Sequence, residues 1–261
     1  MPFAEAAGHR LEYELIDPER LSTSNSRWIV FLHEGLGSVA MWRDFPQRMC
    51  AATGSRGLVY SRHGYGRSEP LFDWKNEPRR VDFMHDEATH ALPELLDILE
   101  IHQPVLLGHS DGGSIALLHA ALTQRPVEAL IVMAPHVLVE DVSIRSIEAA
   151  KVTYETTDLR DKLRRYHDDP DSAFRGWNDI WLDPEFRSWN IEECLPAIRC
   201  PILAIQGIDD EYGTMQQIDR IASGAVNTRV ELVKLANCGH SPHRDQPAAV
   251  IEAAGRFLSA I

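Results

Sequence analysis

Short apolar runs rich in β-branched residues recur along the chain, and stretches with helical spacing of apolar positions separate them. This alternation is typical of strands in a mainly parallel sheet that are connected by helices, so the pattern predicts an α/β fold. The expected strands are 28–32, 57–60, 104–107, 129–133, 202–205 and 230–235, and the expected helices are 82–101, 111–123 and 247–258.

The long stretch between the expected strands at 129–133 and 202–205 breaks this alternation. It is rich in charged and aromatic residues and has helix-like spacing. Open α/β sheets bind ligands at the carboxyl ends of their strands. We therefore expect residues 136–195 to form a helical cap, or lid, inserted over that edge, while residues 1–135 and 196–261 form the core domain.

Aromatic residues are concentrated in this expected cap. Two interpretations stay open, because such side chains either line a ligand pocket or pack the cap onto the core. Trp177 and Trp181 are the candidates for substrate contact.

The pentapeptide Gly108-His109-Ser110-Asp111-Gly112 follows an expected strand and precedes an expected helix, as the G-x-S-x-G motif requires. A sharp turn exposes the serine, and the two glycines let the flanking segments approach closely. The helix start supplies free N–H groups and a positive dipole end for an oxyanion. Ser110 is therefore the predicted nucleophile. A nucleophilic Asp111 would place His109 where this turn needs a small residue, so we set that alternative aside.

Serine is a weak nucleophile and needs a neighbouring base. In hydrolases with this motif the partners follow along the chain in the order serine, acid, histidine. The next-to-last expected strand is followed by Asp209 and Asp210, and the last expected strand is followed by His240. The pattern thus predicts a Ser-His-Asp triad, and two neighbouring aspartates compete for the acid position.

These motifs, in this order, resemble the α/β-hydrolase superfamily over the whole chain. The resemblance implies the α/β-hydrolase fold with an acid in a G-x-x-D turn, which Gly207 and Asp210 match. Asp210 is therefore the expected acid, and Asp209 is expected to be a solvated turn residue or a helix cap. The family's catalytic histidine typically follows a glycine, as His240 follows Gly239.

The segment HEGLGS at 33–38 resembles the oxyanion loop H-G-x-x-G-S of the same superfamily, with Glu34 in place of the first glycine. The resemblance implies that the backbone N–H of Gly35 is one oxyanion donor, with Leu36 as the alternative. The N–H of Asp111, the residue after the nucleophile, is the expected second donor. Glu34 and Leu36 are also candidates for substrate contact.

Two carboxylates, Glu34 and Asp111, are thereby expected near Ser110. They either pair with Arg62 or backbone N–H groups, because buried charges need partners, or they form a subsite for a cationic substrate group. An aspartate after the nucleophile, together with a helical cap, resembles the biphenyl-hydrolase-like (valacyclovir hydrolase) branch. That resemblance implies amino-acid esters as substrates.

Composition narrows the class of protein. Hydrophobic residues make up 44% of the 261 residues and charged residues 25%, as is ordinary for a soluble globular protein. The net charge is −13 without any run of Lys or Arg, so we expect no nucleic-acid partner. No apolar run reaches membrane-spanning length and the first residues lack a signal-peptide pattern, so we expect no membrane association and a cytoplasmic protein.

Metal and cofactor signals are weak. The four cysteines have no C-x-x-C spacing, which favours free thiols in a reducing compartment. His240 and His243 lack a helical H-E-x-x-H frame, so we expect no metal and no cofactor, with His243 as a loop or packing residue.

Three functions are compatible with the sequence. The first is hydrolysis of a small to medium carboxylic ester, thioester or lactone through an acyl-enzyme. The second is a C–C bond hydrolase of aromatic-ring degradation, which would use the same triad. The third is a non-catalytic hydrolase scaffold that senses a ligand, since a fold does not determine a function. The expected partner is a small ester-like molecule, and the sequence does not determine the oligomeric state.

Overall fold

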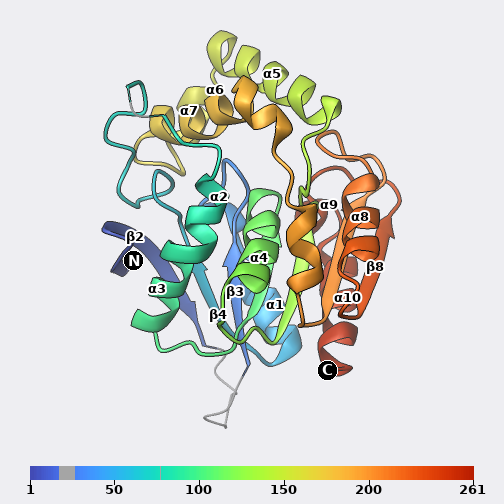
Figure 1. The fold of residues 1–261 in the computed structure, drawn as a ribbon. Helices are drawn as coiled ribbons and strands as arrows, with labels where there is room; N and C mark the ends of the chain where they lie inside the picture. Colours follow the sequence, from blue (N-terminus) through green and yellow to red (C-terminus); the bar gives the residue numbers. More distant parts are fainter. Residues whose placement is uncertain (18–26, 77) are drawn as a thin grey trace.

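The computed structural model describes residues 1–17, 27–76 and 78–261. Its described residues form a sheet of eight strands in the order β1-β2-β4-β3-β5-β6-β7-β8. The strands from β4 to β8 run parallel, and β1 and β2 join their edge antiparallel (Figure 1). The strands are β1 (Phe3–Ala6), β2 (His9–Ile16), β3 (Trp28–Leu32), β4 (Arg56–Tyr60), β5 (Val105–His109), β6 (Ala129–Met133), β7 (Ile202–Gly207) and β8 (Val230–Leu235).

Helices cover both faces of the sheet (Figure 1). The α-helices are α1 (Phe45–Thr53), α2 (Phe83–Asp86), α3 (Leu92–Ile98), α4 (Asp111–Leu122), α5 (Asp141–Thr156), α6 (Leu159–Leu163), α7 (Pro170–Trp181), α8 (Gln216–Gly224), α9 (Pro242–Asp245) and α10 (Pro247–Ser259). Four helical segments are not α-helical, namely η1 (Val39–Trp42), the π-helical η2 (Glu87–Ala91), η3 (Pro184–Ser188) and η4 (Glu192–Ala197).

Central strands β5 and β6 are buried at every position. This explains why they read as continuous apolar runs rather than as alternating patterns, because a parallel sheet is covered on both faces. One apolar core lies between the sheet and helices α1 and α10. The other lies between the sheet and helices α2, α3, α4 and α8, and it continues into α5 and α7. The predicted α/β-hydrolase fold is confirmed.

Several features of the fold were not predicted. The β1–β2 hairpin and helices α1 and α8 fall where no element was expected. The single helix expected over 82–101 is divided into α2, η2 and α3. Pro93 has no N–H to donate to the carbonyl of the residue four positions earlier, and in an α-helix its ring would clash with that carbonyl. The wider π turn just before Pro93 avoids this clash.

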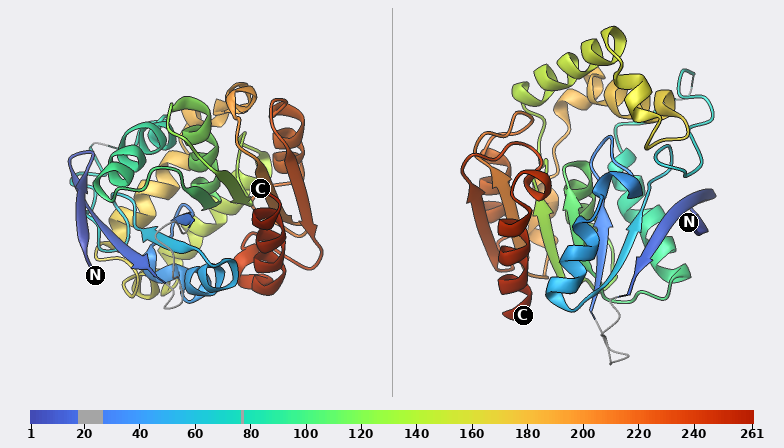
Figure 2. Two further views of the ribbon diagram at one scale, coloured as in Figure 1. Left: turned by 90° about the horizontal axis from the view of Figure 1, so that it is seen from below. Right: turned by 180° about the vertical axis from the view of Figure 1, so that it is seen from behind.

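Helices α5, α6 and α7 lie over the carboxyl ends of the parallel strands (Figure 1), and Figure 2 shows the same arrangement from behind. Helix α7 begins where the carboxylate of Asp169 accepts hydrogen bonds from the N–H groups of Asp171 and Ser172. Such an N-cap satisfies donors that the first helical turn leaves free. These helices fall within the stretch expected to be the cap, while the domain division at its boundaries stays a prediction. None of the described helices combines the length and the apolar character needed to cross a membrane.

Candidate active site

Ser110 occupies the sharp turn between β5 and α4, with φ +52° and ψ −119°. A non-glycine residue in this region is strained and persists only where its surroundings hold it. The two glycines of the motif allow that turn. A Cβ atom on Gly108 would collide with the carbonyl of Gly112, and one on Gly112 would collide with the carbonyl of Leu32. The G-x-S-x-G pattern thus reflects close backbone contact on both sides of the serine.

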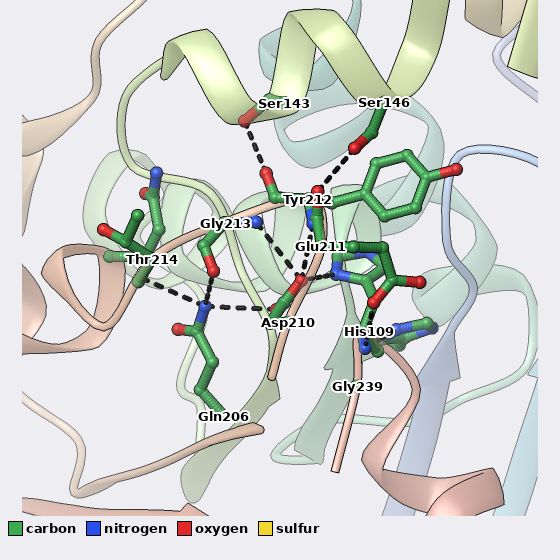
Figure 3. Close-up of polar contacts among 12 residues, drawn as sticks. His109, Ser143, Ser146, Gln206, Asp210, Glu211, Tyr212, Gly213, Thr214 and Gly239 are labelled. Atoms are coloured by element: carbon green, nitrogen blue, oxygen red, sulfur yellow. Dashed lines mark hydrogen bonds and ion pairs between the residues drawn. The ribbon is translucent and has the colours of Figure 1, made fainter. Parts of the chain in front are cut away.

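Asp210 and His240 form a hydrogen-bonded pair. Oδ1 of Asp210 lies 2.8 Å from Nδ1 of His240. The same carboxylate accepts the N–H groups of Tyr212 and Gly213 at 2.8 and 3.2 Å and the amide of Gln206 at 3.1 Å (Figure 3). Burial raises the pKa of Asp210, but the bond and charge of His240 and the N–H of Tyr212 outweigh it and hold the pKa below its ordinary value.

The protonation pattern of His240 follows from this pairing. An ionised carboxylate only accepts hydrogen bonds, so Nδ1 of His240 carries the proton and Nε2 keeps its lone pair. The backbone of the same residue is also held, because its carbonyl lies 2.7 Å from Nε2 of His109 and its N–H donates to Glu211. The orientation of His240 is therefore fixed by contacts to its ring and to its backbone.

The loop that carries Asp210 is attached to helix α5. The hydroxyl of Ser143 donates to the carbonyl of Tyr212, and the hydroxyl of Ser146 donates to the carbonyl of Glu211 (Figure 3). The ring of Tyr212 in turn packs against that of His240, with centroids 4.7 Å apart. Helix α5 thus helps to position the loop that carries Asp210, and it also lies over the sheet.

Ser110 and His240 both line a cavity of about 240 Å³. On the side of the core it is lined by residues at or after the ends of β3, β5, β6, β7 and β8, and the wall on the other side comes from helices α5, α6 and α7. That wall consists of Ile147, Ala150, Leu159, Phe174, Trp177 and Trp181. Trp177 and Trp181 therefore lie where the sequence expectation placed substrate contacts, although both are also buried in the apolar core.

Two backbone segments beside Ser110 could bind an oxyanion. Asp111 is the first residue of α4, where backbone N–H groups have no partner within the helix. Gly35 and Leu36 both line the cavity on the other side. A Cβ atom on Gly35 would collide with the indole of Trp177, so only glycine fits between this loop and α7. The structure brings together the candidates that the sequence proposed.

The side chains of Asp111 and Glu34 differ in whether they line the cavity. The Asp111 carboxylate is fully buried, is not part of the cavity lining, lies 3.7 Å from Arg62 and accepts the indole N–H of Trp181 at 3.2 Å. Burial raises its pKa, against the influence of Arg62 and Trp181. Glu34 lines the cavity and lies 3.4 Å from His109 and 3.3 Å from Arg244.

The cavity residues that the sequence reasoning missed include His136, Tyr212 and Arg244. His136 is almost fully buried and packs against Trp181, with ring centroids 4.9 Å apart. Burial, with the charge of His240 adding to it, lowers the pKa of His136 to about 3, so this ring is neutral near pH 7. The sequence signal that could have identified His136 is its position just after the carboxyl end of a central strand. Tyr212 and Arg244 carried no comparable signal.

The histidines outside the candidate triad have other surroundings. His243 is buried against Trp42 and Phe45, in agreement with the expected packing role. Elsewhere, His9, His63 and Glu69 place donor atoms within 4.8 Å of one another. The two imidazoles stack face to face, with centroids 3.6 Å apart and planes within 9°. Lone pairs in two parallel stacked planes do not converge on one ion, so this arrangement does not form a metal centre.

Comparison with known proteins places the chain in a family. The model of the family described as "Alpha/beta hydrolase family" matches residues 29–253. The sn-1-specific diacylglycerol lipase ABHD11 of Danio rerio is 30% identical over 123 residues, which are 47% of this chain and 35% of that protein. The mouse serine hydrolase BPHL is 24% identical over 188 residues, which are 67% of this chain and 60% of that protein. The chain therefore spans only part of the length of these curated relatives.

Comparison with solved structures agrees with this family assignment in the fold. The enol-lactonase from Burkholderia xenovorans LB400 superimposes with a TM-score of 0.74 at 20% identity, and the match covers 99% of this chain and 100% of that one. At this identity the likeness concerns the fold alone. BPHL gives its name to the biphenyl-hydrolase-like branch that the sequence resembles.

Proposed function

This chain belongs to the alpha/beta hydrolase family, and we propose that it is a serine hydrolase that cleaves small to medium carboxylic esters, thioesters or lactones. One observation carries the proposal. Ser110, on its strained turn, lines the same cavity as His240, whose ring is oriented by Asp210 at 2.8 Å. The diacylglycerol lipase among the similar proteins is named for an ester substrate, which supports an ester-like substrate here.

In the proposed reaction, Nε2 of His240 takes the proton of the Ser110 hydroxyl as its oxygen attacks the substrate carbonyl. Asp210 stabilises the resulting imidazolium. The N–H groups of Gly35 and Asp111 bind the oxyanion of the tetrahedral intermediate, and His240 then protonates the leaving group. Water, activated by the same histidine, hydrolyses the acyl-enzyme and restores the serine.

The cavity limits the size of the substrate group that it can enclose. A dry protein cavity of about 150 Å³ holds benzene, and each further water-sized group takes about 30 Å³. The cavity of about 240 Å³ therefore fits a phenyl ring with about three more non-hydrogen atoms. We infer that the group enclosed against Trp177 and Trp181 is a short aliphatic or single-ring acyl group.

The enclosed group is further proposed to be neutral. Asp111 already faces Arg62 and Trp181, and Glu34 already faces His109 and Arg244. A cationic substrate group would have to displace one of these partners. Alanine methyl ester and N-acetylalanine methyl ester test this, and we expect kcat/KM for the acetylated ester to equal or exceed that for the free amine. A tenfold preference for the free amine would instead assign Glu34 to a cation subsite.

Turnover of a p-nitrophenyl ester series from acetate to decanoate tests the reaction type. We expect a maximum of kcat/KM among the short acyl chains and loss of activity in Ser110→Ala. Turnover of a ring-cleavage dienone without ester turnover would favour the C–C hydrolase alternative. No turnover of either, with the ester bound intact, would favour the ligand-sensing scaffold.

A further inference from the structure

Arg62 is buried directly after β4, with 1% of its surface exposed, although arginine is rarely buried without a partner. Its guanidinium lies over the ring of Tyr65, with 4.9 Å between the guanidinium carbon and the ring centroid. Burial lowers the pKa of Arg62, but the neighbouring Tyr65, Asp111 and Glu87 raise it above its ordinary value, so the side chain stays charged. A buried cation beside the catalytic loops is not explained by the triad.

The guanidinium contacts the oxyanion loop through backbone oxygens. Nη2 of Arg62 donates to the carbonyl of Glu34 at 2.9 Å and approaches the carbonyl of His33 at 3.5 Å. The N–H of Arg62 donates to Nε2 of His33, so Nδ1 of that ring carries the proton and donates to the same Glu34 carbonyl at 2.7 Å. The N–H of Gly37 is a third donor to this oxygen, at 3.0 Å. One carbonyl is thus held from three directions.

This carbonyl belongs to the peptide unit whose N–H is that of Gly35. A peptide unit is planar and, in the trans form, its C=O and N–H point in opposite directions. Fixing the Glu34 oxygen on the Arg62 side therefore fixes the direction of the Gly35 N–H on the other side. Gly35 lines the cavity that contains Ser110.

The other oxyanion segment is held by the same cation. Nη2 of Arg62 also lies 3.7 Å from Oδ2 of Asp111, and both side chains are buried. Asp111 begins the helix that follows the nucleophile. A single guanidinium thus lies between the two backbone segments that bear the expected oxyanion donors.

We propose that Arg62 is a positioning residue that assembles the oxyanion hole, because it directs the Gly35 N–H through the Glu34 carbonyl and links that loop to the turn at Asp111. Arg62 touches no reacting atom itself. The inference rests on the proposed function, because it assumes that the Gly35 N–H stabilises the oxyanion of Ser110 chemistry.

The test compares Arg62→Lys with Arg79→Lys. Lysine keeps the charge but lacks the planar fork that reaches both loops. Arg79 also stacks on Tyr65 but donates to the carbonyl of His63, away from both oxyanion segments, which makes it a matched control. We expect Arg62→Lys to lower kcat about 10- to 100-fold with KM changed less than about threefold, which is below the loss of a whole oxyanion donor. Arg79→Lys should keep both constants.

A spectroscopic readout separates positioning from a general structural role. Carbon-13-labelled 2,2,2-trifluoroacetophenone forms a hemiketal with an activated serine, and the chemical shift of its carbon reports whether the oxygen is ionised. We expect this ionisation to require higher pH in Arg62→Lys than in the unmodified enzyme and in Arg79→Lys. Unchanged ionisation together with unchanged kcat in a folded Arg62→Lys variant would overturn the proposal.

A second variant covers the case that Arg62→Lys does not fold. Arg62→Met with Asp111→Asn removes both charges of this buried pair together, and such replacements are often tolerated. The double variant should fold, as measured by circular dichroism, and show the same shift in hemiketal ionisation. A folded double variant with normal ionisation would overturn the proposal. If Ser110→Ala keeps its esterase activity and the ketone forms no hemiketal, the proposed function fails instead.

Discussion

Oδ1 of Asp210 lies 2.8 Å from Nδ1 of His240, whereas the neighbouring Asp209 is exposed to solvent. The difference arises in the turn after β7, where the N–H groups of Tyr212 and Gly213 hold the Asp210 carboxylate in place. Two adjacent carboxylates of identical chemistry thus have separate roles, and the backbone of the turn determines which one meets the histidine.

Asp210→Asn is expected to lower kcat by about 10⁴-fold, as the loss of a triad carboxylate typically does, because an amide can hold the wrong tautomer of His240. Asp209→Asn is the matched control, since it makes the same chemical change one residue away. It should leave kcat within about twofold because exposed substitutions rarely matter. Steady-state kinetics on p-nitrophenyl butyrate measures both. An equal loss in the two variants would refute the assignment of Asp210 as the acid.

Trp177→Ala is expected to shift the preferred acyl chain to greater length, because the indole forms part of the cavity wall. Trp189→Ala is the control: Trp189 is buried to a similar degree but does not line this cavity. Either change should cost about 3–5 kcal/mol of stability, as large-to-small core substitutions do. The profile of kcat/KM against chain length distinguishes them. The same shift in both variants would mean that cap stability, rather than the wall, determines the preference.

Gly35→Ala is expected to lower kcat strongly, because its Cβ would collide with the indole of Trp177 and displace the oxyanion loop. Combining it with Trp177→Ala removes the colliding ring, so part of the lost kcat should return. The two single variants and the double variant form a thermodynamic cycle. Purely additive effects on kcat would show that the collision does not explain the glycine.

Folding stability is expected to fall as the pH decreases from about 6.5 towards 4. Burial lowers the pKa of His167 to about 4 and that of His136 to about 3, both below the unfolded value of about 6.5. The unfolded chain therefore binds more protons in this range, so stability is complete above about pH 6.5 and is lost as the pH falls. Each histidine contributes a slope of at most about 1.4 kcal/mol per pH unit, with the steepest part between its folded and unfolded pKa values.

His167→Asn tests this dependence. Its amide oxygen can replace Nδ1, which accepts the N–H of Gly66 at 2.9 Å. Urea unfolding between pH 4.5 and 6.5 should show a mean slope reduced by about 1 kcal/mol per pH unit. His102→Asn, at an exposed histidine, should leave the slope unchanged. Equal slopes for all three proteins would contradict the buried neutral state of His167.

The strands and the triad candidates could be predicted because their signals are local. Buried parallel strands leave continuous apolar runs, and the nucleophile turn needs glycines at fixed offsets from Ser110. The choice of Asp210 over Asp209 depended on the family's turn, and the structure pairs this carboxylate with His240. The β1–β2 hairpin was missed because the buried positions of β1 hold only Ala4 and Ala6, while the larger apolar side chains of Phe3 and Leu15 are exposed.

The contacts that complete the site join residues far apart in the chain. Arg62 and Asp111 were weighed as partners, yet only the fold shows that Trp181 from α7 reaches the same carboxylate. His136 follows β6 and His240 follows β8, and the two strands lie on either side of β7 in the sheet, with the two rings 5.8 Å apart between centroids. Neither segment of the sequence shows this strand order. The π turn before Pro93 likewise could not be predicted, because the helical spacing of apolar residues does not show that the proline would clash with an α-helical backbone.

The most direct test of the account is the site of covalent modification by a fluorophosphonate. The unmodified protein, digested after labelling and examined by mass spectrometry, should carry a single adduct on the peptide that contains Ser110. Labelling should disappear in Ser110→Ala and slow markedly in His240→Ala, because the serine needs its base. An adduct on another residue, or equal labelling of Ser110→Ala, would contradict the assignment of Ser110 as the nucleophile.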